Sequence, residues 1–113
     1  MKLSEIVKKL DLSVKTGSNS LDVEVSRGYA SDLLSDVIAH AEEGDVWITL
    51  QIHQNIVAVA TMKSLGGIIL IGGRQPGDDT VEKAEQEGIP ILLSELPAFE
   101  LVGRLYELGI TGN

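Results

Sequence analysis

Apolar residues recur three and four positions apart in several parts of the chain, which is the spacing of amphipathic helices. Leu3, Ile6, Val7 and Leu10 form one such face, so we expect a short helix over residues 3–10. The same spacing predicts helices over residues 33–41 and 98–108, and a more polar helix is expected over residues 80–86. Ser31 or Asp32 precedes the second of these helices and is a candidate N-cap.

Residues 55–65 form a helical segment of a different kind, because apolar side chains lie on nearly every side of it. A helix of this type has to be covered on both faces. We therefore expect it either in the middle of the domain or beneath another copy of the protein.

Short apolar runs bounded by turn residues indicate strands. Buried strands are predicted over residues 46–50, 68–71 and 89–93. Residues 21–26 alternate strictly between apolar and polar side chains, so we predict a half-buried edge strand there. The segment between Asp11 and Ser20 receives no assignment.

Strands and helices alternate from residue 21 onward, an order typical of βαβ units. Right-handed crossovers place helices on both faces of a parallel sheet. We predict an α/β fold, specifically a three-layer α/β/α sandwich with a mainly parallel sheet of four to five strands. No linker, repeat or low-complexity segment interrupts the pattern, so residues 1–113 are expected to form a single domain.

The charge balance and the absence of cysteine exclude several functions. The chain has nine Lys and Arg residues and 17 Asp and Glu residues. The resulting net charge of −8 repels nucleic acid and anionic lipid surfaces. Without cysteine there is no thiol catalysis, no thiolate metal site and no disulfide. No apolar run reaches the length of a membrane helix or a signal peptide, so we expect a cytoplasmic protein with no membrane or nucleic-acid partner.

Ligands of open α/β sheets gather at the carboxyl ends of the strands. The predicted strands bring four segments to this edge: Gly28 with Tyr29, residues 51–55, residues 72–75, and Ser94 with Glu95. In the third segment, the N–H groups of Gly72 and Gly73 and the side chain of Arg74 could hold a carboxylate or phosphate. The alternative is that the glycines serve a tight turn and that Arg74 pairs with Asp78 or Asp79.

The histidines and the paired acids leave similar alternatives open. His53, Gln54 and Asn55 could bind a ligand through hydrogen bonds, although a helix-capping role is the simpler interpretation. His40 is expected to pair with Asp36 on the surface, and Asp78 with Asp79 is expected to start a helix. These residues form no recognisable metal or catalytic motif, so we predict no metal, no cofactor and no enzymatic activity.

Trp47 on a predicted strand and Arg104 and Tyr106 on the last predicted helix are residue types that often anchor interfaces. A core or covered position is equally common for each of them, and the sequence leaves both options open.

Residues 68–73 followed by Pro76, residues 82–85 leading to residues 88–91, and the closing residues 99–101 resemble the DRTGG domain family. This family is related to the non-catalytic N-terminal domain of bacterial HPr kinase. The resemblance covers most of the chain and implies a regulatory domain that often lies at dimer contacts.

Two departures from the family pattern limit what the resemblance implies. Residues 51–55 stand where the family usually has an Asp-Arg pair, and Ile71 replaces a threonine before the glycines. Through residues 47–51 the chain resembles stand-alone members of the family that are encoded beside iron-hydrogenase or NADH-dehydrogenase-like subunits. This resemblance implies a redox-complex protein as a partner.

Two functional hypotheses follow. The first is a non-catalytic regulatory or assembly domain that forms a homodimer and docks on a larger redox or metabolic complex. The second is a small-molecule sensor that binds a nucleotide or another anionic metabolite, with Gly72, Gly73 and Arg74 holding its charge and with His53, Gln54 and Asn55 providing specificity. A ligand bound at a dimer edge would allow both.

Overall fold

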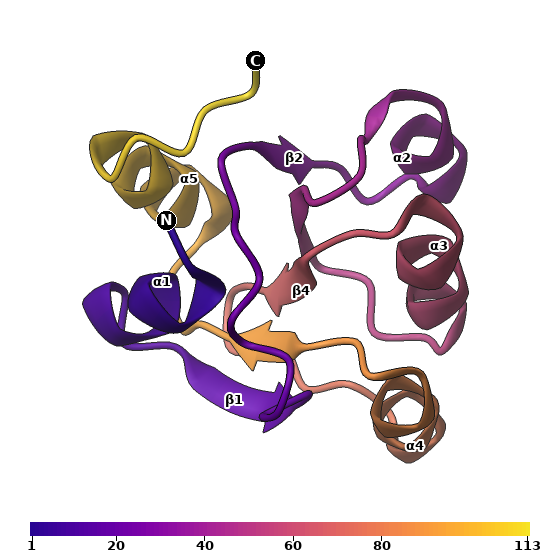
Figure 1. Ribbon diagram of the computed structural model, residues 1–113. Coiled ribbons are helices and arrows are strands. Elements are labelled where there is room, and N and C mark those ends of the chain that lie inside the picture. Colours follow the sequence, from indigo (N-terminus) through magenta and orange to yellow (C-terminus); the bar gives the residue numbers. More distant parts are fainter.

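The computed structural model describes residues 1–113 and contains one five-stranded sheet between two layers of helices (Figure 1). This confirms the predicted three-layer α/β/α sandwich. The elements follow one another in the order α1 (Leu3–Lys9), β1 (Ser13–Thr16), β2 (Gly28–Ala30), α2 (Leu34–His40), β3 (Val46–Thr49), α3 (Asn55–Lys63), β4 (Gly67–Leu70), α4 (Asp78–Glu87), β5 (Ile91–Leu93) and α5 (Ala98–Glu107).

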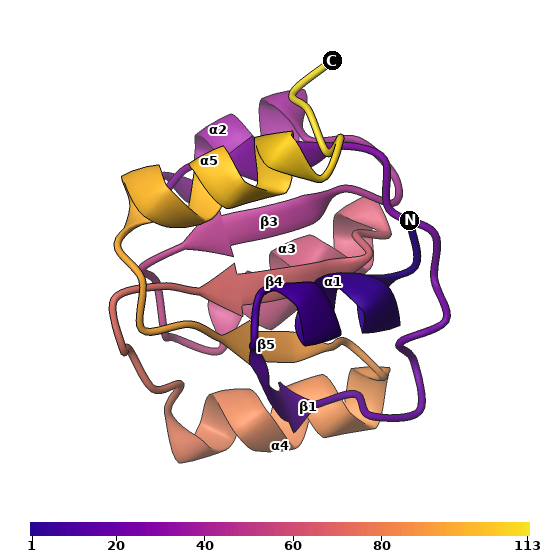
Figure 2. The same cartoon turned by 90° about the vertical axis from the view of Figure 1, so that its left-hand side faces the viewer.

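The strand order in the sheet is β1-β5-β4-β3-β2. Strands β2 to β5 are parallel to one another, and β1 is antiparallel to β5. Helices α2, α3 and α4 each join neighbouring parallel strands and lie together on one face, whereas α1 and α5 cover the other (Figures 1 and 2). The sheet therefore separates two hydrophobic cores, one on each side.

Helix α3 is covered inside the domain, as the first of the two alternatives predicted. It contacts α2 on one side and α4 on the other, and Ile56, Val57 and Ala60 are fully buried. Met62 lies on the outer side and is 63% exposed. The apolar character of α3 is explained without a second copy of the chain.

The predicted edge strand at residues 21–26 is wrong. Its apolar positions do turn inward, and Val25 is fully buried. However, the segment joins no sheet, because the carbonyl groups of Leu21 and Val23 accept hydrogen bonds of 2.9 Å from the N–H groups of Ser4 and Leu3. These are N–H groups of the first turn of α1, which lack partners inside the helix.

Two edge strands were not foreseen at their true positions. Strand β2 comes later than residues 21–26, and β1 lies in the segment left unassigned. Within β1, only Thr16 is buried, and its hydroxyl donates to the Ile89 carbonyl (2.8 Å) and accepts from the Ile91 N–H (2.9 Å). A strand with three exposed residues out of four has no alternating pattern to recognise.

Trp47 belongs to the core and does not face a partner. It is fully buried, and its indole N–H donates to the Ser31 carbonyl at 2.8 Å. Tyr106, in contrast, is 54% exposed, and the Arg104 side chain is 53% exposed.

No helix of the molecule combines the length and the apolar composition required to span a bilayer.

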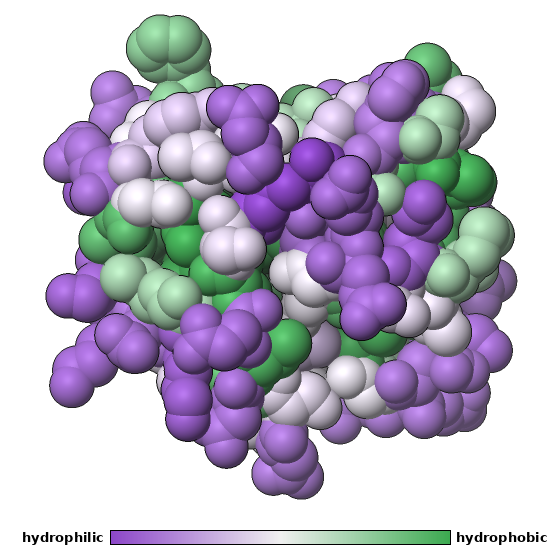
Figure 3. Space-filling view, turned by 45° about the horizontal axis from the view of Figure 1, so that its top comes forward, coloured by the Kyte–Doolittle hydropathy of each residue, from purple (hydrophilic) through white to green (hydrophobic).

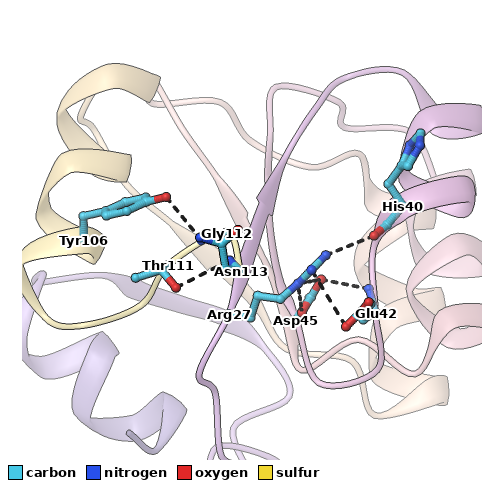
Figure 4. A network of polar contacts seen from close by, with 8 residues as sticks. All are labelled: Arg27, His40, Glu42, Asp45, Tyr106, Thr111, Gly112 and Asn113. Atoms are coloured by element: carbon cyan, nitrogen blue, oxygen red, sulfur yellow. Dashed lines mark hydrogen bonds and ion pairs between the residues drawn. The ribbon is translucent and has the colours of Figure 1, made fainter.

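The segment before β2 is fixed by a partly buried charged pair (Figure 4). The Nε atom of Arg27 lies 3.0 Å and 3.1 Å from the two carboxylate oxygens of Asp45, whose side chain is only 2% exposed. Arg27 also donates to the His40 carbonyl at 3.0 Å, and Asp45 accepts from the Glu42 N–H at 2.8 Å. This network joins the start of β2 to the end of α2 and to the turn before β3.

Candidate functional site at the carboxyl edge of the sheet

The parallel strands end at one edge of the sheet, where the arrowheads of β3 and β4 point in Figure 2. Residues 51–55, residues 72–75 and Ser94 with Glu95 follow β3, β4 and β5 there, as expected. Gly28 and Tyr29 do not, because they lie within β2 itself. The residues that follow β2 at this edge are Ser31 and Asp32.

Asp32 joins the ends of β2 and β3. Its Oδ1 atom accepts from the Thr49 hydroxyl (2.8 Å) and from the Leu50 N–H (2.7 Å), and its carbonyl accepts from the Gln51 side chain (2.9 Å). The predicted capping role is wrong, because α2 has no side-chain cap at its N-terminus. Position along the chain could not reveal this role, because the partners of Asp32 are 17 to 19 residues away.

The glycine turn after β4 is fixed against the segment after β5. Gly72 and Gly73 have φ angles of 63° and 72°, so the turn requires the left-handed conformation that glycine favours. All three backbone N–H groups donate to main-chain carbonyls: Gly72 to Leu96 (2.8 Å), Gly73 to Ser94 (3.0 Å) and Arg74 to Ile71 (3.2 Å). These N–H groups are therefore occupied, and only the Arg74 side chain remains to hold an anion.

Two further contacts define the charge around this turn. A Cβ atom on Gly73 would lie 2.6 Å from a carboxylate oxygen of Glu95, so this acidic side chain lies directly against the turn. The expected pairing of Arg74 with Asp78 or Asp79 is wrong, because Arg74 forms no ion pair. Its exposed guanidinium is available to a ligand.

A depression of about 480 Å³ lies between the N-terminal ends of α3 and α4. It is lined by Ile52, His53, Gln54, Gly77, Asp78, Asp79 and Thr80. The Ile52 carbonyl accepts from the Gly77 N–H (3.3 Å) and from the Thr80 hydroxyl (2.7 Å), which holds the two walls together.

The predicted capping role is met only in part: the Nδ1 atom of His53 accepts a hydrogen bond of 3.1 Å from the Asn55 N–H at the start of α3, whereas Gln54 at the N-cap position forms no side-chain cap bond. His53 and Gln54 line the depression, but Asn55 and the glycine turn do not. The residues predicted to form one site are therefore divided between the depression and the turn beside Glu95. Asp78 and Asp79 make the depression acidic, so a phosphate group is disfavoured there and an uncharged polar group fits better.

The clearest electrostatic perturbation lies away from this edge. The Tyr29 hydroxyl donates to the Asp36 carboxylate at 2.8 Å. This hydrogen bond lowers the pKa of Asp36 and raises the pKa of Tyr29. His40 lies 3.0 Å from Asp36, which confirms the predicted surface pair. No group of three potential metal-ligating side chains occurs in the molecule.

No protein-family model matches the sequence, and no curated protein is significantly similar to it. Among solved structures, the chain is similar to the CBS and DRTGG domains of the regulatory region of Clostridium perfringens pyrophosphatase, complexed with the activator diadenosine tetraphosphate. The TM-score is 0.74 at 17% sequence identity. The chain has a DRTGG-like fold.

The superposition covers 96% of this DRTGG-like domain but only 47% of the pyrophosphatase chain, so the domain spans about half the length of its structural relative. Two side chains of residues 51–55 form hydrogen bonds within the domain: Gln51 donates to the Asp32 carbonyl, and His53 accepts from the Asn55 N–H.

Proposed function

We propose that the chain is a non-catalytic regulatory or assembly domain that works in the cytoplasm as a homodimer. The observation that carries this proposal is the exposure of aromatic side chains on α5. Phe99 is 91% exposed and Tyr106 is 54% exposed. The chain has only one Phe, two Tyr and one Trp, so half of its aromatic residues lie on the outer side of one helix. Exposed aromatic groups of this kind are typical of association surfaces.

The surface as a whole supports an assembly role. Its hydrophilic background is interrupted by hydrophobic patches on the side of α1 and α5 and on the side of α2 and α3 (Figure 3). The sequence suggested association through the apolar helix α3, but α3 is covered within the domain. The argument for association therefore rests on α5.

Light scattering on the purified chain at tens of micromolar tests the proposal. We expect a molar mass near twice the monomer value of 12.1 kDa. A mass of one chain at every concentration up to about 100 μM, where even weak specific dimers form, would contradict the homodimer.

A redox-complex partner remains part of the proposal and rests on the sequence resemblance alone. The resembling segment is not itself a docking surface, because Trp47, Ile48 and Thr49 are buried. Co-expression with a hydrogenase or NADH-dehydrogenase-like subunit should yield a complex that survives two chromatographic steps. Separate elution of the two proteins would remove this partner class.

A second candidate function is a sensor of a nucleotide or another anionic metabolite. Two observations favour it: the depression lined by His53 and Gln54, and the unpaired guanidinium of Arg74. The structural relative is described as complexed with diadenosine tetraphosphate. We infer that phosphates would bind at Arg74 and that the depression would take an uncharged part of the ligand.

Thermal unfolding with mono- and dinucleotides tests the sensor hypothesis. A ligand at 100 times its dissociation constant adds about 2.7 kcal/mol of stability. For a domain of this size, that raises the midpoint by roughly 10 °C. The shift should disappear in Arg74→Ala and persist in Lys9→Ala, a control on the exposed side of α1. An unchanged shift in Arg74→Ala would exclude Arg74 as the phosphate ligand.

A further inference from the structure

A smaller cavity of about 190 Å³ lies at the carboxyl edge of the sheet, on the face that α1 and α5 cover. Figure 2 shows that α5 begins at the end of the sheet to which β3 and β4 point. The walls of the cavity are mostly apolar and consist of Ala30, Ile48, Leu50, Ile71 and Ala98. Ile48 and Ile71 are buried, but Leu50 is 40% exposed, so part of this apolar surface is open to solvent.

Three polar residues complete the lining, and Asp32 is the one that keeps an unused charged atom. The Thr49 hydroxyl donates to Asp32 Oδ1 (2.8 Å) and accepts from the Gln51 N–H (3.1 Å). The Ser31 hydroxyl accepts from the Leu33 N–H (3.2 Å). Asp32 Oδ1 accepts two hydrogen bonds, whereas Oδ2 forms none within the chain. The carboxylate also forms no ion pair, so its charge is available to a ligand.

We propose that this cavity binds a short aliphatic amine, with the ammonium group on Asp32 Oδ2 and the hydrocarbon part against Ile48 and Ile71. One free carboxylate oxygen suits an ammonium group, which acts as a point charge, whereas a guanidinium group is held best by two oxygens. A hard divalent cation needs several oxygen ligands, and no group of three potential metal-ligating side chains is present. The net charge of −8 favours the approach of a cation.

The burial of the lining residues gives the direction in which the amine enters. Asp32 is exposed, whereas Ile48 and Ile71 form the buried walls. The hydrocarbon part therefore enters first, and the ammonium group stays at the opening. At about 30 Å³ per water-sized group, the cavity holds roughly six non-hydrogen atoms, a size that n-butylamine matches. A lysine of a partner protein does not fit in this direction, because its backbone would have to occupy the buried end.

Titration of the unmodified chain with n-butylamine, followed by the amide signals in nuclear magnetic resonance, tests the site. The amine is protonated at about pH 7. Saturable shifts should be confined to residues 30–32, 48–50 and 71, with a dissociation constant on the order of 1 mM. n-Butanol has the same hydrocarbon part without the charge and should bind at least about tenfold more weakly. Equal binding of n-butanol would contradict an ammonium site.

Two variants test the two parts of the cavity separately. Asp32→Asn keeps an oxygen for Thr49 and Leu50 but removes the charge, so it should bind n-butylamine at least about tenfold more weakly. Asp22→Asn is the matched control, because it removes the same charge from a side chain that is 93% exposed, and its binding should be unchanged. Ala98→Leu places a larger side chain in the cavity without a change of charge and should abolish the saturable shifts. Circular dichroism shows whether each variant is folded, and Ala98→Leu carries the test if Asp32→Asn is not.

Three results would overturn the amine site. The first is unchanged binding in folded Asp32→Asn or in Ala98→Leu. The second is a set of shifts that rise linearly with concentration at acidic residues throughout the chain, which is the result of non-specific attraction. The third is binding of Nα-acetyl-lysine amide as tight as that of n-butylamine, which would exclude a free amine as the occupant. None of these results bears on the proposed homodimer or on nucleotide binding at Arg74, because neither uses Asp32.

Discussion

Arg27 and Asp45 allow a quantitative test of how the start of β2 is held. The Asp45 carboxylate is 2% exposed, and it accepts both the Arg27 guanidinium and the Glu42 N–H. Replacing Arg27 by Met keeps much of the side-chain volume but leaves a buried carboxylate without its counter-charge. Removing one partner of a buried pair costs about 3 to 5 kcal/mol.

This cost converts into a large thermal effect. Unfolding entropies of about 2.1 cal/mol/K per residue imply that 1 kcal/mol shifts the midpoint of a domain of this size by about 4 °C. We therefore expect Arg27→Met to lower the melting temperature by roughly 12 to 20 °C. Urea titration should show the same loss as a lower transition midpoint at an unchanged slope.

A double-mutant cycle isolates the pair. Adding Asp45→Asn to Arg27→Met removes the uncompensated charge while keeping an acceptor for Glu42, so the double variant should recover part of the lost stability. The exposed pair of Lys83 and Glu87, 3.4 Å apart, is the control, and Lys83→Met should cost less than about 0.5 kcal/mol. Equal losses in Arg27→Met and Lys83→Met would refute the reasoning.

Three further substitutions test separate parts of the structure. Gly17→Ala should destabilise the fold by more than about 2 kcal/mol in urea titration, because φ is +72° and the new Cβ would lie 2.6 Å from the Pro90 backbone. Thr16→Val should cost about 2 to 4 kcal/mol in the same assay, because it leaves a buried N–H and a buried carbonyl unpaired. Tyr29→Phe removes the hydrogen bond that lowers the pKa of Asp36. A lowered carboxyl pKa stabilises the fold above about pH 4. The melting temperature of Tyr29→Phe should therefore be lower than that of the unmodified chain near neutral pH, and the two melting temperatures should converge in acid.

The central part of the fold could be predicted because burial on both faces leaves a clear trace in the sequence. Continuous apolar runs mark β3 and β4, and α3 is apolar on nearly all sides because α2 and α4 flank it. The edge strands β1 and β2 and the segment over residues 21–26 could not be predicted in this way. Residues 21–26 have the alternation of a strand, but their carbonyl groups bond the first turn of α1, a long-range contact that no local pattern records.

The candidate site shows the same limit. That the loops after β3, β4 and β5 share one edge follows from parallel topology alone, and it was predictable. The occupation of the Gly72 and Gly73 N–H groups was not, because their acceptors, Leu96 and Ser94, lie more than 20 residues away in the sequence. Whether a glycine turn is an open anion site or a fixed structural turn depends on such distant acceptors.

Nuclear magnetic resonance on a dilution series of the unmodified chain tests the central claim most directly, because 113 residues give well-resolved amide signals. We predict that concentration-dependent shifts are confined to α5 and the adjoining C-terminal residues, with α3 and the carboxyl edge unaffected. Spectra that do not change with concentration, or changes centred on α3, would contradict a homodimer formed through α5.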